Sequence, residues 1–129
     1  MRSRPALFTT TAVLEFGTGA ALFFVPGTVI QLLLGAAESA AAAMPVARAV
    51  GLGLIALGTA AWLRRDDGAL ARSDLLSGML VYNVAIGITL AVAGKLRGQS
   101  GVMLWPVVAL HGAMAIWCVL CIRARNTRA

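Results

Sequence analysis

The chain has 129 residues, of which 60% are hydrophobic and only 12% are charged, and its mean hydropathy is +0.86. These values lie far outside the composition of a water-soluble domain. The net charge of +6 could indicate nucleic acid, but the basic residues stand at the ends of apolar segments, which is typical of membrane topology signals. The composition therefore predicts that the lipid bilayer, and not nucleic acid, is the partner of this chain.

The first apolar segment, at about 6–25, follows two arginines and contains Glu15 near its centre. A carboxylate in the middle of the run argues against a signal peptide and favours a first membrane span. Thr11, Glu15 and Thr18 recur at i, i+4 and i+7, so they form a polar stripe along one side of a helix. This face is expected to point into a helix bundle.

Pro26 and Gly27 end the first span. The apolar stretch 28–34 is too short to cross a bilayer, so it is expected to lie at the interface or to re-enter the membrane. The second span begins in the alanine run 40–43 or near Pro45, and we place it at about 44–63. Arg48 then lies one turn inside it.

A charged hairpin at 64–74 leads to a third span at about 75–93, and a turn with Lys95 and Arg97 leads to a fourth at about 102–122. A spanning helix takes about 20 residues, so four spans use up the whole chain. The sequence therefore predicts an all-α polytopic membrane protein, a four-helix transmembrane bundle in a single domain. Small residues four apart indicate close helix contacts; these pairs are Gly17–Ala21, Ala47–Gly51, Ala49–Gly53 and Gly87–Ala91.

Lysine and arginine are distributed unequally between the two sides of the predicted membrane. Eight lie on the side of the termini and of the 64–74 hairpin, whereas the opposite side has only Lys95 and Arg97. The excess places both termini in the cytoplasm and the protein in the inner (plasma) membrane. Trp62 and Trp105, near the ends of spans, are expected to be interfacial anchors, and Trp117 is expected to be packed.

Each predicted span carries polar side chains that hydrocarbon disfavours. A charge at the centre of a spanning helix costs at least about 2.5 kcal/mol, so we expect Glu15 and Arg48 to pair inside the bundle. Two interpretations remain open: a ligand pocket in the outer half of the membrane, or a structural cluster that fixes helix register. The cluster consists of Glu15, Arg48, Tyr82, Asn83 and His111.

No known catalytic or phosphate-binding motif is present in the sequence, so whether the chain is an enzyme stays open. Cys118 and Cys121 form a C-x-x-C pair, but they stand at the end of a span and are expected to be reduced packing residues. His111, Met114, Cys118 and Cys121 share a helix face but extend over roughly 15 Å. No metal site is predicted.

The second-span sequence is Arg48-Ala-Val-Gly51-x-Gly53 followed by Trp62-Leu63-Arg64. In this sequence, in its length and in its four spans, the chain resembles the small bacterial four-helix membrane proteins loosely related to the DoxX-like families. Some relatives are linked to quinone-coupled or redox membrane complexes. The resemblance therefore implies a lipophilic ligand such as a quinone, although the cofactor itself stays unknown. The polar cluster and the absence of catalytic motifs favour a ligand-binding or accessory membrane protein with a pocket for an amphiphile. The expected partner is a second copy of the chain or a membrane complex.

Two alternatives are a small transporter and a membrane enzyme. The small multidrug resistance family is similar in having four spans and an acidic residue midway along the first. The charge bias and Arg48 argue against that assignment. An enzyme would use Glu15 and His111 as acid and base, which requires both side chains to reach one substrate atom.

Overall fold

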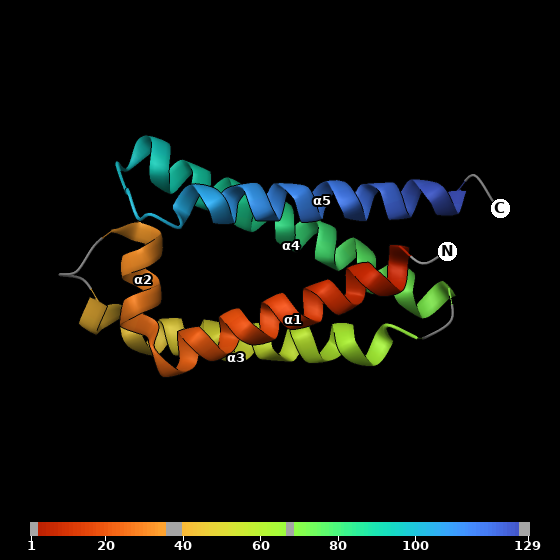
Figure 1. Cartoon of the computed structure of the whole chain (residues 1–129), viewed down its shortest axis with the longest axis horizontal. Coiled ribbons are helices and arrows are strands. Elements are labelled where there is room, and N and C mark those ends of the chain that lie inside the picture. Colours follow the sequence, from red (N-terminus) through yellow and green to blue (C-terminus); the bar gives the residue numbers. More distant parts are fainter. Residues whose placement is uncertain (1–2, 36–39, 67–68, 127–129) are drawn as a thin grey trace.

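The computed structural model describes residues 3–35, 40–66 and 69–126, which fold into five helices without any strand (Figure 1). The helices are α1 (Ser3–Phe24), α2 (Pro26–Leu34), α3 (Ala40–Arg64), α4 (Ala69–Leu96) and α5 (Leu104–Asn126). Four of them, all except α2, are long and apolar enough to cross a membrane. The structure thus confirms an all-α helical membrane bundle, and the chain is a small integral membrane protein.

Helix α3 begins at the earlier of the two predicted positions, and α4 begins earlier than predicted. Helix α3 begins in the alanine run at Ala40, so Pro45 lies inside the helix and not in its first turn. Helix α4 begins at Ala69 instead of near residue 75, so Asp74 lies within it. The sequence Ala69-Leu70-Ala71-Arg72 consists of strong helix formers. Helix propensity therefore extends α4 beyond the apolar segment that hydropathy marks.

Helix α2 corresponds to the short segment that was predicted to lie at the interface or to re-enter the membrane, and the structure shows that it is helical. Pro26 opens it at a position where a missing backbone N–H costs nothing. Gly35 ends it with a left-handed φ of 70°, and the Gly35 N–H donates to the Gln31 carbonyl at 2.9 Å. Nine residues reach about 14 Å, less than half of the hydrocarbon thickness. The helix therefore caps one end of the bundle without crossing it.

The four long helices form two antiparallel hairpins, α1 with α3 and α4 with α5 (Figure 1). In the first hairpin the backbones approach closely at glycines. A Cβ on Gly19 would lie 2.6 Å from the Gly51 carbonyl oxygen, and a Cβ on Gly58 would lie 3.0 Å from that of Ala12. The two helices can approach this closely because glycine has only a hydrogen atom as its side chain.

A second contact joins the two hairpins at the end where α1 begins and α5 finishes. Side chains from all four long helices meet there and form the main core. This core consists of Leu7, Phe8 and Ala12 from α1, Ala61 from α3, Leu76 and Met79 from α4, and Met114, Cys118 and Cys121 from α5. Trp117 packs against it, as the sequence predicted.

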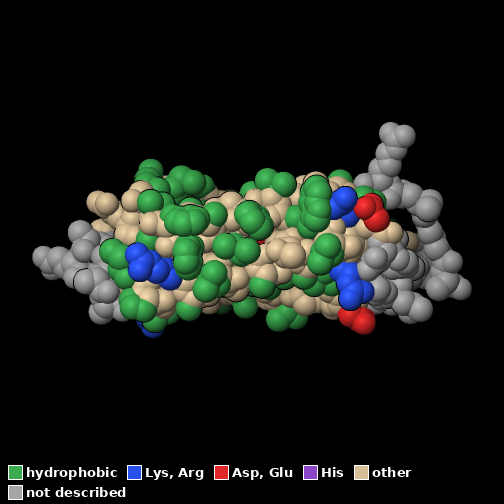
Figure 2. Space-filling view, turned by 90° about the horizontal axis from the view of Figure 1, so that it is seen from below, with side chains coloured by type: hydrophobic (Ala, Val, Ile, Leu, Met, Phe, Trp, Pro, Cys, Tyr) green, Lys and Arg blue, Asp and Glu red, His purple; other side chains and the backbone are tan. Residues whose placement is uncertain are grey.

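The outer surface has the polarity of a membrane protein. Figure 2 shows lysine and arginine toward the two ends of one face, with hydrophobic side chains between them. Trp62 is half exposed at one end of the bundle, and the Arg65 guanidinium lies over its ring, 3.7 Å from the centroid. At the other end, the Lys95 ammonium lies over the Trp105 ring, 5.4 Å from its centroid. Both tryptophans thus have the position expected of interfacial anchors.

Candidate functional site

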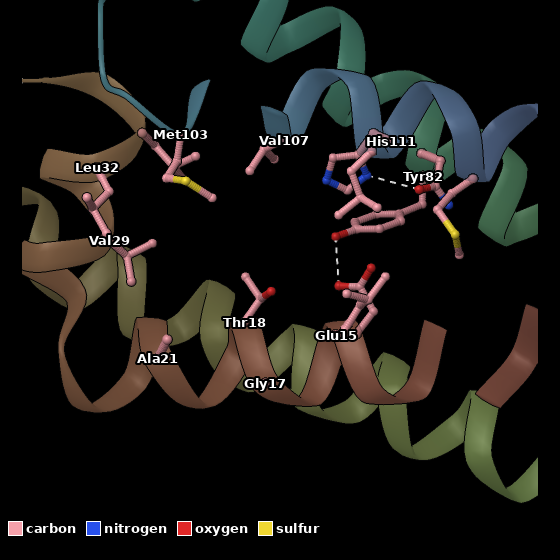
Figure 3. Close-up of a pocket in the computed structure, with 15 residues that line it drawn as sticks. Glu15, Gly17, Thr18, Ala21, Val29, Leu32, Tyr82, Met103, Val107 and His111 are labelled. Atoms are coloured by element: carbon pink, nitrogen blue, oxygen red, sulfur yellow. Dashed lines mark hydrogen bonds between the residues drawn. The ribbon is translucent and has the colours of Figure 1, made fainter. Parts of the chain in front are cut away.

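A partly open cavity of about 330 Å³ lies between the two hairpins (Figure 3). Its volume is at the lower end of the range of small-molecule sites, roughly 300 to 1,000 Å³. Most of its wall is apolar. It is lined by Leu14, Glu15, Gly17, Thr18 and Ala21 of α1, Val29, Leu32 and Leu33 of α2, Tyr82 and Asn83 of α4, and Met103, Val107, Leu110, His111 and Met114 at and around the start of α5.

Glu15 is the acidic group of the cavity, and its side chain is only 7% exposed. The Tyr82 hydroxyl donates a hydrogen bond of 2.9 Å to Glu15 Oε2 (Figure 3). Because Glu15 lies on α1 and Tyr82 on α4, this bond connects the two hairpins near the middle of the membrane. A hydrogen bond to a carboxylate is among the strong ones in a medium without water.

Asn83 and His111 form a second bonded pair next to the first. Asn83 Nδ2 donates to the Met79 carbonyl at 2.8 Å, and Asn83 Oδ1 lies 2.9 Å from His111 Nδ1. The rings of His111 and Tyr82 meet edge to face with their centroids 5.7 Å apart. Four of the five polar residues singled out from the sequence therefore converge at one end of the cavity.

The fifth, Arg48, lies elsewhere, and the predicted pairing of Glu15 with Arg48 is wrong. Arg48 is exposed on the outside of α3, and among the described residues no cationic side chain bonds to Glu15. Gly51 and Gly19 stand at the same level. Arg48 precedes Gly51 toward the α2 end, whereas Glu15 precedes Gly19 toward the opposite end. Seven helical residues, about 10 Å along the axis, therefore separate the two charges.

The apolar end of the cavity was not predicted from the sequence. It is formed by α2, whose side chains Val29, Leu32 and Leu33 face inward, and by Met103 (Figure 3). The Met103 N–H donates to the Leu32 carbonyl at 2.9 Å, which attaches α2 to the chain that leads into α5. The Pro-Gly pair marked where α2 begins, but hydropathy carries no signal for the direction in which a short apolar helix packs.

Thr11, Cys118 and Cys121 lie outside this cavity. Thr11, one turn from Glu15 on α1, is buried, and its hydroxyl has no hydrogen-bond partner in the structure. Cys118 and Cys121 are free thiols buried in the core between the hairpins. Within the described ranges, no three His, Cys, Asp or Glu side chains are placed to hold a metal ion.

A second depression, of about 500 Å³, lies on the membrane-facing side of the α1–α3 hairpin. Phe16 and Trp62 flank it, and its one hydroxyl, that of Thr59, donates to the Ile55 carbonyl at 2.8 Å. It therefore has no free polar side chain that could orient a ligand, in contrast to the cavity with Glu15.

In comparisons with known proteins, no family model, no curated protein and no solved structure matches this chain.

Proposed function

We propose that this membrane protein binds an amphiphilic or lipophilic ligand in the cavity between its hairpins. The observation that carries the proposal is the convergence of Glu15, Tyr82, Asn83 and His111 at one end of an otherwise apolar cavity. Ligand sites typically combine an apolar wall with a few polar groups that orient the ligand. Polar side chains inside a membrane that only fix helix register need no such space beside them.

The same cavity is compatible with either role that the sequence suggested, a ligand-binding protein or an accessory subunit of a membrane complex. Acid–base chemistry by Glu15 and His111 is less favoured, because each side chain is engaged by another residue. Glu15 accepts from Tyr82, and His111 is bonded to Asn83. A shared substrate atom would have to displace both contacts.

Filling the cavity tests this proposal. Ala21 lines the cavity on α1, whereas Ala109 is exposed on α5 and lines neither depression. Ala21→Trp should occupy much of the cavity and reduce any co-purifying lipophile at least about tenfold. Ala109→Trp adds the same bulk toward the membrane and should leave the lipophile in place. Mass spectrometry of organic extracts from the purified proteins measures both. Equal retention in the two variants would contradict ligand binding in this cavity.

We further propose that both termini are cytoplasmic, because eight of the basic residues lie on their side of the membrane. Two introduced cysteines test this orientation in a Cys118→Ala, Cys121→Ala background. Ser100→Cys, in the turn before α5, should react with a membrane-impermeant maleimide in intact cells. Asp66→Cys, after the end of α3, should react only after the cells are opened. The reverse labelling pattern would overturn the orientation.

A further inference from the structure

We infer that the polar end of the cavity recognises a head group that donates hydrogen bonds, an ammonium or a hydroxyl, in preference to one that only accepts them. This inference rests on the proposed ligand-binding function and specifies the chemistry of the ligand. It follows from the hydrogen bonds that the four polar side chains make with one another and with the backbone.

The orientation of the Asn83 amide is fixed by its own helix. Its Nδ2 lies 2.8 Å from the Met79 carbonyl, so the amide must present hydrogen there, because its oxygen would be repelled by that carbonyl. Asn83 Oδ1 is therefore the atom that faces His111 Nδ1, 2.9 Å away. An oxygen without hydrogen can only accept, so His111 Nδ1 carries the proton. In the neutral imidazole Nε2 is then left as an acceptor.

The Tyr82–Glu15 pair likewise leaves hydrogen-bond acceptors for a ligand. The hydrogen of the Tyr82 hydroxyl is used in the bond to Glu15 Oε2, so the phenol oxygen keeps only lone pairs for a ligand. Glu15 lines the cavity, and within the described residues only its Oε2 is hydrogen-bonded, so Oε1 is left for a ligand. We take Glu15 to be ionised when an ammonium is bound, and in that state its carboxylate has no hydrogen to give.

Lone pairs of three side chains, Glu15, Tyr82 and His111, thus line the polar end of the cavity. A ketone or an oxidised quinone has only carbonyl oxygens, and these find no hydrogen on Glu15, Tyr82 or His111. The side-chain hydroxyl that a carbonyl could reach is that of Thr18, three residues further along α1. The quinone that the DoxX-like resemblance implies is therefore not matched by the polar end of the cavity. A hydroxyl can bond to any of the three, and an ammonium also supplies the positive charge that no described side chain brings to Glu15.

Three single-chain probes of equal carbon number separate these chemistries: decylammonium, 1-decanol and 2-decanone. Binding is measured on the full chain in lipid nanodiscs, with empty nanodiscs to subtract partitioning into the bilayer. We expect 1-decanol to bind at least about threefold, and decylammonium at least about tenfold, more tightly than 2-decanone, as befits a neutral and a charge-assisted hydrogen bond. Ala21→Trp should weaken all the binding that takes place in the cavity.

A matched pair of variants assigns the ammonium preference to Glu15. Glu15→Gln should remove the advantage of decylammonium over 1-decanol, whereas Asp66→Asn makes the same change at an exposed carboxylate outside the cavity and should preserve it. If no probe responds to Ala21→Trp, the proposed cavity function itself fails. If 2-decanone binds in the cavity as tightly as the other two, cavity binding stands and the donor preference is refuted.

The protonation of His111 gives a second readout that needs no ligand. It is the one histidine in the sequence, so ¹⁵N-histidine labelling gives the signals of a single side chain. At neutral pH we expect a protonated Nδ1 and an unprotonated Nε2. The opposite tautomer, or hydrogen on both nitrogens, would place a donor in the cavity and overturn the inference.

Discussion

Replacing Gly51 with leucine is expected to destabilise the protein by about 3 kcal/mol, the upper part of the usual range for overpacking. A Cβ at this position would lie 2.6 Å from the Gly19 carbonyl oxygen and 3.0 Å from the Phe23 backbone nitrogen. Neither is the end of a flexible side chain, so α1 and α3 would have to separate. Separation would remove contacts along the whole hairpin, because each close approach depends on the others.

Gly53→Leu is the matched control, two residues further along the same helix. A Cβ on Gly53 meets nothing within 4 Å. Both substitutions gain about 0.8 kcal/mol in helix propensity, so the difference between them isolates the contact with α1. Unfolding in mixed micelles by titration with a denaturing detergent measures both. Equal stability of the two variants would show that α1 and α3 do not touch at Gly51.

The bond between Tyr82 and Glu15 is expected to appear as a strong coupling in a double-mutant cycle. Glu15→Leu leaves the phenol without its acceptor, and Tyr82→Phe leaves the carboxyl without its donor, so each change alone exposes an unsatisfied polar group. The double variant removes both groups. We expect the destabilisations to fall short of additivity by about 1 to 3 kcal/mol, the range for residues in one network.

Arg48 supplies the control for this cycle. Arg48→Leu combined with Glu15→Leu should be additive within about 0.5 kcal/mol, because the two side chains lie about 10 Å apart along the hairpin and share no partner. The same detergent titration measures both cycles. Additivity for Tyr82, or strong coupling for Arg48, would contradict the arrangement of the cavity.

Hydropathy was sufficient to predict the four spans and the failure of the segment 28–34 to cross, because the length of an apolar run decides whether a helix can cross a bilayer. It did not predict that this segment is helical. It also sufficed to group Glu15, Tyr82, Asn83 and His111. Each lies within a span, where hydrocarbon disfavours polar groups, so each was expected to turn inward.

The partner of Glu15 was beyond the reach of the sequence because it depends on how far α1 and α3 slide past one another. That register is set by contacts at glycines. Of the four small-residue pairs, Ala47–Gly51 is buried, whereas Gly17, Ala49 and Gly53 are exposed. Spacing alone does not distinguish them. Arg48 tolerates its exposed position because a long arginine side chain near the start of a span can reach the membrane interface.

The close approach of α1 and α3 also limits how the cavity can adapt to ligands of different size. The backbones of α1 and α3 are already in contact at Gly19, Gly51 and Gly58, so the two helices cannot move closer together. The α1–α3 hairpin is therefore expected to move as a rigid body. The α4–α5 hairpin packs against the α1–α3 hairpin through the nine-residue core at one end. At the other end, the backbone bond from Met103 to Leu32 and the tight seat of Gly101 against Leu32 and Leu33 hold it. Extra room for a larger ligand therefore requires the two hairpins to tilt against one another about the core, and opening at the α2 end would break the bond from Met103 to Leu32.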